Sequence, residues 1–458
     1  MRRKLPARIR FAQLVLTLGL LVGLAPATHA ADADPKVPFE RYTLDNGLEI
    51  ILHQDRRVPI VAVNVWYHVG SGDETPGKSG FAHLFEHMMF QGAKHIGEDV
   101  HFDLLKKIGG TGINGSTTSD RTNYFETVPS NQIETALWLE SDRMGYMLSL
   151  LNEKSLANQR DVVRNERRQR YDNVPYGKER FALSAALYGE GHPYRYMTIG
   201  LHEDLERASL GDVTSFFKKW YVPANATLVI AGDFETDQAK KLVAKWFGTF
   251  PKTTRPAHTE IAPTAVAGPA RQSIQDDFAK LRRVHYAWHS PKQYAPGDAE
   301  LEILADVLGR EGTGRLYKVL VHERQLAQNV AVYQYGAGFS GTFNVIVDLK
   351  ADADQAEVEK ILDKELERAM REPLSDREIK RAVVGVESSF VWGLEDLMAR
   401  VETLQGYNHF VGRPDYISQD LARYRTATPQ DILAMAARTL GKRGRVEVIT
   451  TPSSKGGN

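Results

Sequence analysis

The sequence has 458 residues, more than one ordinary hydrophobic core uses, which favours two or more domains. Its hydrophobic content of 42% and charged content of 25% exclude a collagen, a coiled coil and a wholly disordered chain. The 58 basic residues only balance the 58 acidic ones, so the chain lacks the basic surface that nucleic acid binding needs. The absence of cysteine excludes disulfides and thiolate metal sites, so any metal must be held by His, Asp or Glu.

Residues 1–30 have the pattern of a signal peptide. A basic start precedes an apolar run at residues 11–24, and small residues follow, with cleavage expected after Ala30 or Ala27. An uncleaved membrane anchor is the alternative, but a spanning helix needs about 20 apolar residues, and no later stretch is long and apolar enough to span. Removal of residues 1–30 leaves a net charge of −5. We therefore expect a periplasmic protein, with secretion into the medium as the alternative.

Strands and helices alternate along the next part of the chain. β-Branched and alternating segments predict strands at residues 49–53, 60–69, 113–117 and 122–128. Helical periodicity predicts helices at residues 80–90, 102–108, 131–150 and 153–172. This mixture predicts an α+β fold.

The chain divides near its middle. Residues 251–272 begin with a run rich in Pro, Thr and Ala that has no periodicity, which is typical of an interdomain linker. We expect one domain at residues 31–250 and a second at residues 273–454.

The two halves resemble each other. A helix start at Asp212 followed by a strand from Ala226 recurs at Asp431 and Arg445, and the offset in numbering is 219 for both pairs. The same offset lays residues 60–69 over 279–288. Coincidence between common helix–strand patterns is one explanation. A duplicated domain of roughly 200 residues also accounts for the chain length and the linker position.

The segment from His83 to His87 (HLFEH) carries the strongest chemical signal. Residues four apart share one helix face, so both imidazoles can point at one ion, and Glu86 can reach a water there. In hydrolases zinc takes three protein ligands and lowers the pKa of a bound water to about 7. The pattern is the reversed form of a common zinc-peptidase motif. A surface helix with incidental His and Glu is the alternative.

Glu166 is the candidate third ligand, far downstream of His87 in the chain. It lies on the predicted helix 153–172, on one face with Gln159 and Arg170. If that face meets the first helix, a His2Glu site is complete. Taken alone, Glu166 is better explained as a solvated ion-pair partner of its arginine neighbours.

Four segments resemble the zinc peptidases of the pitrilysin, insulin-degrading enzyme and mitochondrial processing peptidase family, the inverzincins. They are residues 80–90 (GFAHLFEHMMF), 158–168 (NQRDVVRNERR), 192–195 (HPYR) and 220–233 (WYVPANATLVIAGD). The resemblance covers the whole mature chain. It implies two homologous domains, each a mostly antiparallel sheet backed by helices, together half of a clamshell.

The resemblance also implies the residue roles. One zinc ion per chain is held by His83, His87 and Glu166, with Glu86 as general base. In residues 109–117 (GGTGINGST), Asn114 contacts the substrate backbone on an edge strand. The unpaired backbone groups of an edge strand can bind an extended peptide. A Gly-rich hairpin with a turn-favouring Asn is also consistent with this segment of the sequence.

The sequence departs from the family pattern in three places. Gln159 stands where many relatives have a second glutamate. Val321 and Gln328 stand where long relatives carry an Arg and a Tyr that contact substrate. We therefore expect a heterodimer with a second homologous subunit that supplies the Arg–Tyr pair, with a homodimer as the alternative.

The second half lacks a metal motif. At the offset of 219, the motif residues fall on Glu302, Ala305 and Asp306. The best-supported function is therefore a zinc endopeptidase with one metal site, acting on extended or unfolded peptides. A non-catalytic scaffold or partner subunit is the alternative, and a hydrolase of non-peptide substrates is weaker, because the edge strand favours a peptide ligand.

Overall fold

The computed structural model describes residues 34–98, 100–258, 261, 266 and 271–453. The predicted signal peptide at residues 1–30 lies outside the described residues, as do much of the predicted linker and residue 454. In the part of the chain that is described, no helix has the length and apolar character needed to cross a bilayer.

The N-terminal half forms a six-stranded sheet in the order β1-β2-β6-β3-β5-β4. Neighbouring strands are antiparallel, except that β2 and β6 are parallel. β4 is one of the two edge strands. The strands are β1 (Glu40–Thr43), β2 (Glu49–Gln54), β3 (Ile60–Tyr67), β4 (Thr111–Thr117), β5 (Thr122–Pro129) and β6 (Ala226–Gly232).

The C-terminal half forms a five-stranded sheet in the order β7-β11-β8-β10-β9, in which only β7 and β11 are parallel. Its strands are β7 (Arg271–Asp276), β8 (Arg283–Ser290), β9 (Ala327–Tyr335), β10 (Gly341–Leu349) and β11 (Val446–Pro452). Each sheet is backed by helices around its own apolar core. The predicted α+β fold of two similar domains is confirmed.

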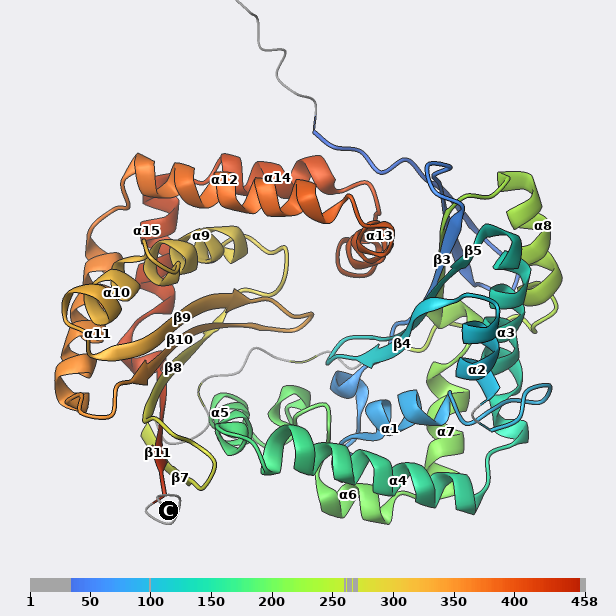
Figure 1. The fold of residues 1–458 in the computed structure, drawn as a ribbon, viewed down its shortest axis with the longest axis horizontal. Coiled ribbons are helices and arrows are strands. Elements are labelled where there is room, and N and C mark those ends of the chain that lie inside the picture. Colours follow the sequence, from blue (N-terminus) through green and yellow to red (C-terminus); the bar gives the residue numbers. More distant parts are fainter. Residues whose placement is uncertain (1–33, 99, 259–260, 262–265, 267–270, 454–458) are drawn as a thin grey trace, which may run out of the picture. The chain divides into compact units, whose positions relative to one another are not determined.

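Helices separate and cover the strands in both halves (Figure 1). Those of the first half are α1 (Phe81–Met88), α2 (Val100–Lys107), α3 (Ile133–Tyr146), α4 (Glu153–Arg167), α5 (Gly177–Leu187), α6 (His202–Arg207), α7 (Leu210–Trp220) and α8 (Thr236–Phe247). Those of the second half are α9 (Asp298–Gly309), α10 (Arg315–Tyr317), α11 (Gln355–Arg371), α12 (Asp376–Gly393), α13 (Leu397–Val411), α14 (Ile417–Arg425) and α15 (Pro429–Thr439).

The structural repeat follows the sequence offset closely. α7 and α15 start and end at equivalent positions under the offset of 219, and so do the starts of β5 and β10. Both helices begin with a capping box, formed by Ser209 with Asp212 and by Thr428 with Asp431. The repeated helix start that the sequence indicated therefore has the same local structure in both halves.

The offset fails for the strand pair β3 and β8. Overlaying residues 60–69 on 279–288 places the start of β3, Ile60, on Ala279. β8, however, begins later, at Arg283. The gapless overlay of these two segments is therefore wrong, because β8 starts four residues later than the offset of 219 places it.

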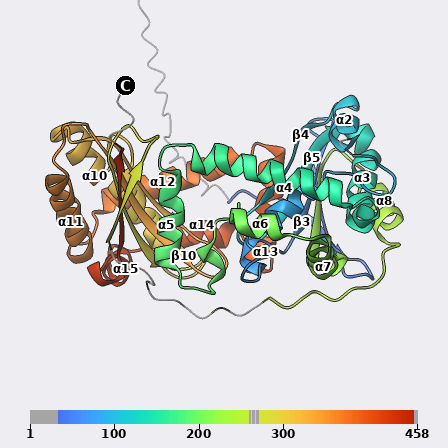
Figure 2. The same cartoon turned by 90° about the horizontal axis from the view of Figure 1, so that it is seen from below.

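Each half contributes one helix to the sheet of the other half, and these two helices occupy equivalent positions in the repeat. α5 belongs to the first half but packs on β7, β8 and β11, whereas α13 belongs to the second half and packs on β3 and β6 (Figure 1; Figure 2). Val401 and Leu404 of α13 share a small core with Ala62 and Val229. Each helix covers a sheet face that its own half leaves open, so the two halves stabilise each other.

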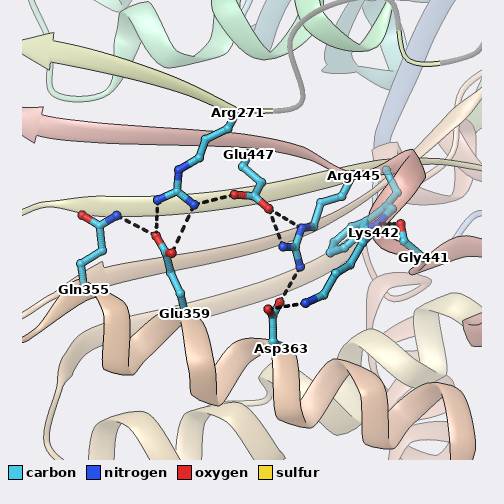
Figure 3. Close-up of polar contacts among 9 residues, drawn as sticks. Arg271, Gln355, Glu359, Asp363, Gly441, Lys442, Arg445 and Glu447 are labelled. Atoms are coloured by element: carbon cyan, nitrogen blue, oxygen red, sulfur yellow. Dashed lines mark hydrogen bonds and ion pairs between the residues drawn. The ribbon is translucent and has the colours of Figure 1, made fainter.

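An ion-pair network fastens β7, the first strand after the linker, to its neighbours (Figure 3). Arg271 of β7 contacts Glu447 of β11 and Glu359 of α11. Arg445, directly before β11, contacts Glu447 and Asp363 of α11. The two arginines share Glu447, so the ion pairs form a network. Such a network stabilises the position of β7 beside β11 more than isolated surface ion pairs would.

Candidate metal centre

α1 presents its two histidines on one side and its apolar residues on the other. Phe81, Leu84 and Phe85 are buried in the first core, while the rings of His83 and His87 lie 4.7 Å apart between centroids. The helix begins after Gly80, whose φ is +85° and on which an added Cβ would lie 2.8 Å from Gly200 Cα, so a larger residue is disfavoured there. Spacing and packing together aim both imidazoles the same way.

α4 brings the third predicted ligand to these rings. Glu166 Oε2 lies 3.6 Å from His83 Nε2 and 3.3 Å from His87 Nε2. Bond lengths of about 2.1 Å in a tetrahedral zinc site require ligand atoms about 3.4 Å apart. The three side chains therefore fit a zinc ion in both donor type and separation.

The protonation states also suit metal binding. Burial and the neighbouring His87 lower the pKa of His83 to about 4, so its ring is neutral, as a ligand must be. Burial acts to raise the pKa of Glu166, but contacts with His87 and His83 lower it on balance. The other Glu166 oxygen, Oε1, lies 2.9 Å from Arg170 Nη1, which holds the carboxylate in place.

Glu86 lies beside the three ligand candidates. It is 9% exposed, and burial raises its pKa despite the hydrogen bond that Thr117 Oγ1 donates to its Oε2 at 2.5 Å. Edge strand β4 comes this close because Gly115 has no side chain, and a Cβ there would lie 3.1 Å from Glu86 Cγ. No sequence pattern indicated the Thr117 contact, because it joins two separate elements that are distant in the chain.

A cavity of about 520 Å³ opens over these residues. Asn114 lines it from β4 and is exposed, although its Oδ1 accepts a hydrogen bond from the N–H of Gly115 at 2.9 Å. Gln159 lines it from α4 and is buried. Within the described residues, the buried Nδ1 of His83 has no hydrogen-bond partner, whereas metal-binding histidines usually donate a hydrogen bond through this atom.

The other residues that the sequence singled out lie away from this cavity. Val321 packs against the second core, and Gln328 is exposed on β9. Glu302 contacts Tyr424, and Asp306 pairs with Arg310. The second half thus uses its counterparts of the motif for structural contacts.

Among the described residues, one further group of His and Glu side chains is close enough to hold an ion. His101, Glu126 and Glu140 are buried in the first core, and Arg143 pairs with Glu140. A guanidinium in contact with a would-be ligand disfavours a cation there.

Comparison with known proteins matches the sequence to one family. Residues 49–192 match the family described as Insulinase (Peptidase family M16), and residues 207–385 match the Peptidase M16 inactive domain. The chain belongs to peptidase family M16. The predicted membership of the pitrilysin group is thereby confirmed, and the M16 inactive domain covers much of the half in which the motif positions are Glu302, Ala305 and Asp306.

Two relatives of this M16 chain are similar to it over most of their length. The zinc protease PqqE of Helicobacter pylori is 29% identical over 429 residues, covering 89% of this chain and 92% of that protein. An uncharacterized zinc protease of Streptomyces coelicolor is 27% identical over 425 residues, covering 89% of each chain.

Solved structures share the fold. The crystal structure of a protease from Helicobacter pylori has a TM-score of 0.82 at 24% identity and covers 91% of this chain and 100% of that one. The periplasmic protease PqqL of Escherichia coli has a TM-score of 0.77 at 17% identity. That match covers 93% of this M16 chain but 49% of PqqL, so the chain corresponds to half of the longer protein.

Proposed function

We propose that this protein is a zinc-dependent endopeptidase that hydrolyses extended or unfolded peptides. The observation that carries the proposal is the separation of 3.3 and 3.6 Å between Glu166 Oε2 and the two histidine nitrogens, with Glu86 beside them. His83, His87 and Glu166 would hold one zinc ion per chain. A zinc ion there supplies a Lewis acid that polarises the scissile carbonyl and acidifies water.

Glu86 is the general base in this proposal. Its carboxylate takes the proton of the attacking water and then passes it to the leaving amine. A carboxyl whose pKa is raised by burial is better matched to this exchange near neutral pH. Thr117 fixes the rotamer of Glu86 through its hydrogen bond.

Edge strand β4 is the proposed peptide-binding element. Its outer backbone groups are unpaired in the sheet, so a substrate can add as a further strand. Asn114 would donate its side-chain amide to the substrate backbone near the scissile bond. Gln159 would support the metal helix with a neutral hydrogen-bonding group in place of a charge.

We also infer how the chain is organised in the cell. Residues 1–30 would be removed on export to the periplasm, leaving a metal domain at 31–250, a linker at 251–272 and a silent duplicate at 273–454. The partner would be a homologous subunit carrying the Arg–Tyr pair that Val321 and Gln328 replace; a homodimer is the alternative. The match of this chain to half of PqqL supports such an assembly from two halves.

Zinc analysis and peptide cleavage by the mature chain, with and without a co-expressed homologous subunit, test the proposal. Cleavage that disappears on chelation and returns with zinc supports it. A chain that binds zinc but cleaves no peptide in any assembly would instead be the non-catalytic subunit of a peptidase complex.

A further inference from the structure

A second cavity of about 520 Å³ adjoins the catalytic one. Thr117 and Thr198 line both cavities, so the two lie next to each other at the end of β4. The second cavity lies between α5 and the side chains of β8, β9 and β10. A peptide leaving the catalytic cavity past Thr117 therefore enters it directly.

The walls of this cavity are rich in aromatic rings. Leu183, Met197 and Ile346 add apolar surface. Tyrosine rings suit the edge-to-face and offset contacts that other aromatic side chains make. The lining tyrosines are Tyr176, Tyr188, Tyr194, Tyr196, Tyr333 and Tyr335.

Most charges of the cavity are already paired within the protein. Glu179 is buried and bound to His285 Nδ1 and Thr450 Oγ1, each at 2.7 Å. Arg283 pairs with Asp348 at 2.7 Å. Because these charged groups are already paired, this part of the cavity has little net charge with which to bind a ligand.

Arg180 differs from these paired residues of the cavity. It is exposed on α5, lines the cavity and has no ion pair with any residue in the described part of the chain, and its guanidinium lies 5.7 Å from the ring centroid of Tyr171. A free guanidinium beside an aromatic cavity favours a carboxylate on the same ligand.

We propose that this cavity is a specificity site that binds an aromatic side chain of the substrate, while Arg180 pairs with an acidic residue next to it. The inference rests on the proposed peptidase function and names its substrate class: unfolded peptides with an acidic–aromatic pair on one side of the scissile bond. The site then selects among peptides that β4 binds through backbone groups common to all of them.

Binding tests the site separately from catalysis. Zinc-loaded Glu86→Gln protein is titrated with fluorescent peptides in which a Glu-Phe pair is scanned along an otherwise Ala-rich sequence, and anisotropy gives Kd. At one register the Glu-Phe peptide should bind about tenfold more tightly than its Ala-Ala counterpart, the usual value of a filled apolar pocket. In the active protein the same register should raise kcat/KM.

Variants then assign the preference to these residues. Tyr333→Ala with Tyr335→Ala should abolish the preference for Phe; these rings are 41% and 52% exposed, so the fold should survive. Trp392→Ala removes a ring that is 69% exposed on α12 and should leave the preference intact. Arg180→Glu should turn the preference from Glu-Phe to Lys-Phe.

The outcomes separate the two proposals. Selective binding without cleavage in any assembly contradicts the peptidase function. Cleavage with equal affinity for Phe and Ala peptides at every register, or a preference unchanged in the tyrosine double variant, overturns the specificity site.

Discussion

At the scale of single residues, the structure gives the two glutamates of the candidate site different surroundings. Glu86 and Glu166 are both carboxylates near two histidines, but the oxygen of Glu166 lies at ligand distance while Glu86 is held by Thr117. Glu86→Gln should therefore keep about one zinc per chain and lose activity by about 10²- to 10⁴-fold. Glu166→Gln should lose metal affinity instead. Elemental analysis beside a peptidase assay distinguishes the two.

His83→Ala and His87→Ala are the matched metal-site variants for that experiment. Full zinc occupancy in the double variant, or parental cleavage by Glu86→Gln, would contradict the assignment.

The hydroxyl of Thr117 gives a second prediction at this scale. Thr117→Val keeps the shape of the side chain but removes the donor to Glu86. A hydrogen bond to a charged group is worth about 1.5–3 kcal/mol, so kcat should fall about 10- to 100-fold. Thr117→Ser, which keeps the hydroxyl, should restore most of kcat, and zinc content should stay constant in both. Equal kcat for the Val variant and the parent would show that Glu86 needs no such support.

At the scale of elements, the exchanged helix α13 makes a contact that should depend on pH. His409 of α13 stacks on His68, beyond the end of β3, and their Nδ1 atoms lie 2.7 Å apart. Burial and nearby Arg255 lower the pKa of His409 to about 3, and burial lowers that of His68. Both rings are therefore neutral in the folded protein and titrate near pH 6.5 when it unfolds.

A lowered histidine pKa in the folded state makes stability complete above about pH 6.5 and reduces it as the pH falls toward 3. At pH 5 the loss from His409 alone is about 2 kcal/mol. Urea unfolding at pH 7 and pH 5 should show this loss in the parent and a smaller one in His409→Gln. His322→Gln, at an exposed position, is the control and should behave like the parent. The same pH dependence in parent and His409→Gln would contradict the prediction.

At the scale of the whole molecule, the chain has one candidate metal centre in the described residues, and it has Val321 and Gln328 where the family resemblance predicts a substrate-binding Arg and Tyr. Loss of one oxyanion-stabilising donor costs about 10²- to 10³-fold in other hydrolases. The isolated chain should therefore be nearly inactive, and a homologous subunit that carries the pair should restore activity by that factor. Size-exclusion chromatography with light scattering, run beside the peptidase assay, measures both. Full activity from a monomer or homodimer, unchanged by any partner, would rule out this dependence.

The sequence by itself determined what depends on short spacings and on repetition. His83, Glu86 and His87 share one helix face because a helix turns every 3.6 residues, and the constant offset between Asp212 and Asp431 marked the two similar halves before any contact was known. The order of most strands and helices also follows from local patterns. The ends of elements follow less closely: the predicted helix at 153–172 is α helix to Arg167 and continues to Asp172 as a wider π turn.

Only the tertiary structure decided what depends on packing between distant segments. Glu166 has no spacing relation to His87, and it reaches the histidines because α4 packs on α1. Thr117 meets Glu86 only because the edge strand closes over α1 at Gly115. The exchange of α5 and α13, and the cavity that α5 forms with the second sheet, have no local signal at all. Such contacts join residues far apart in the chain, and local propensity carries no information on which surfaces will meet.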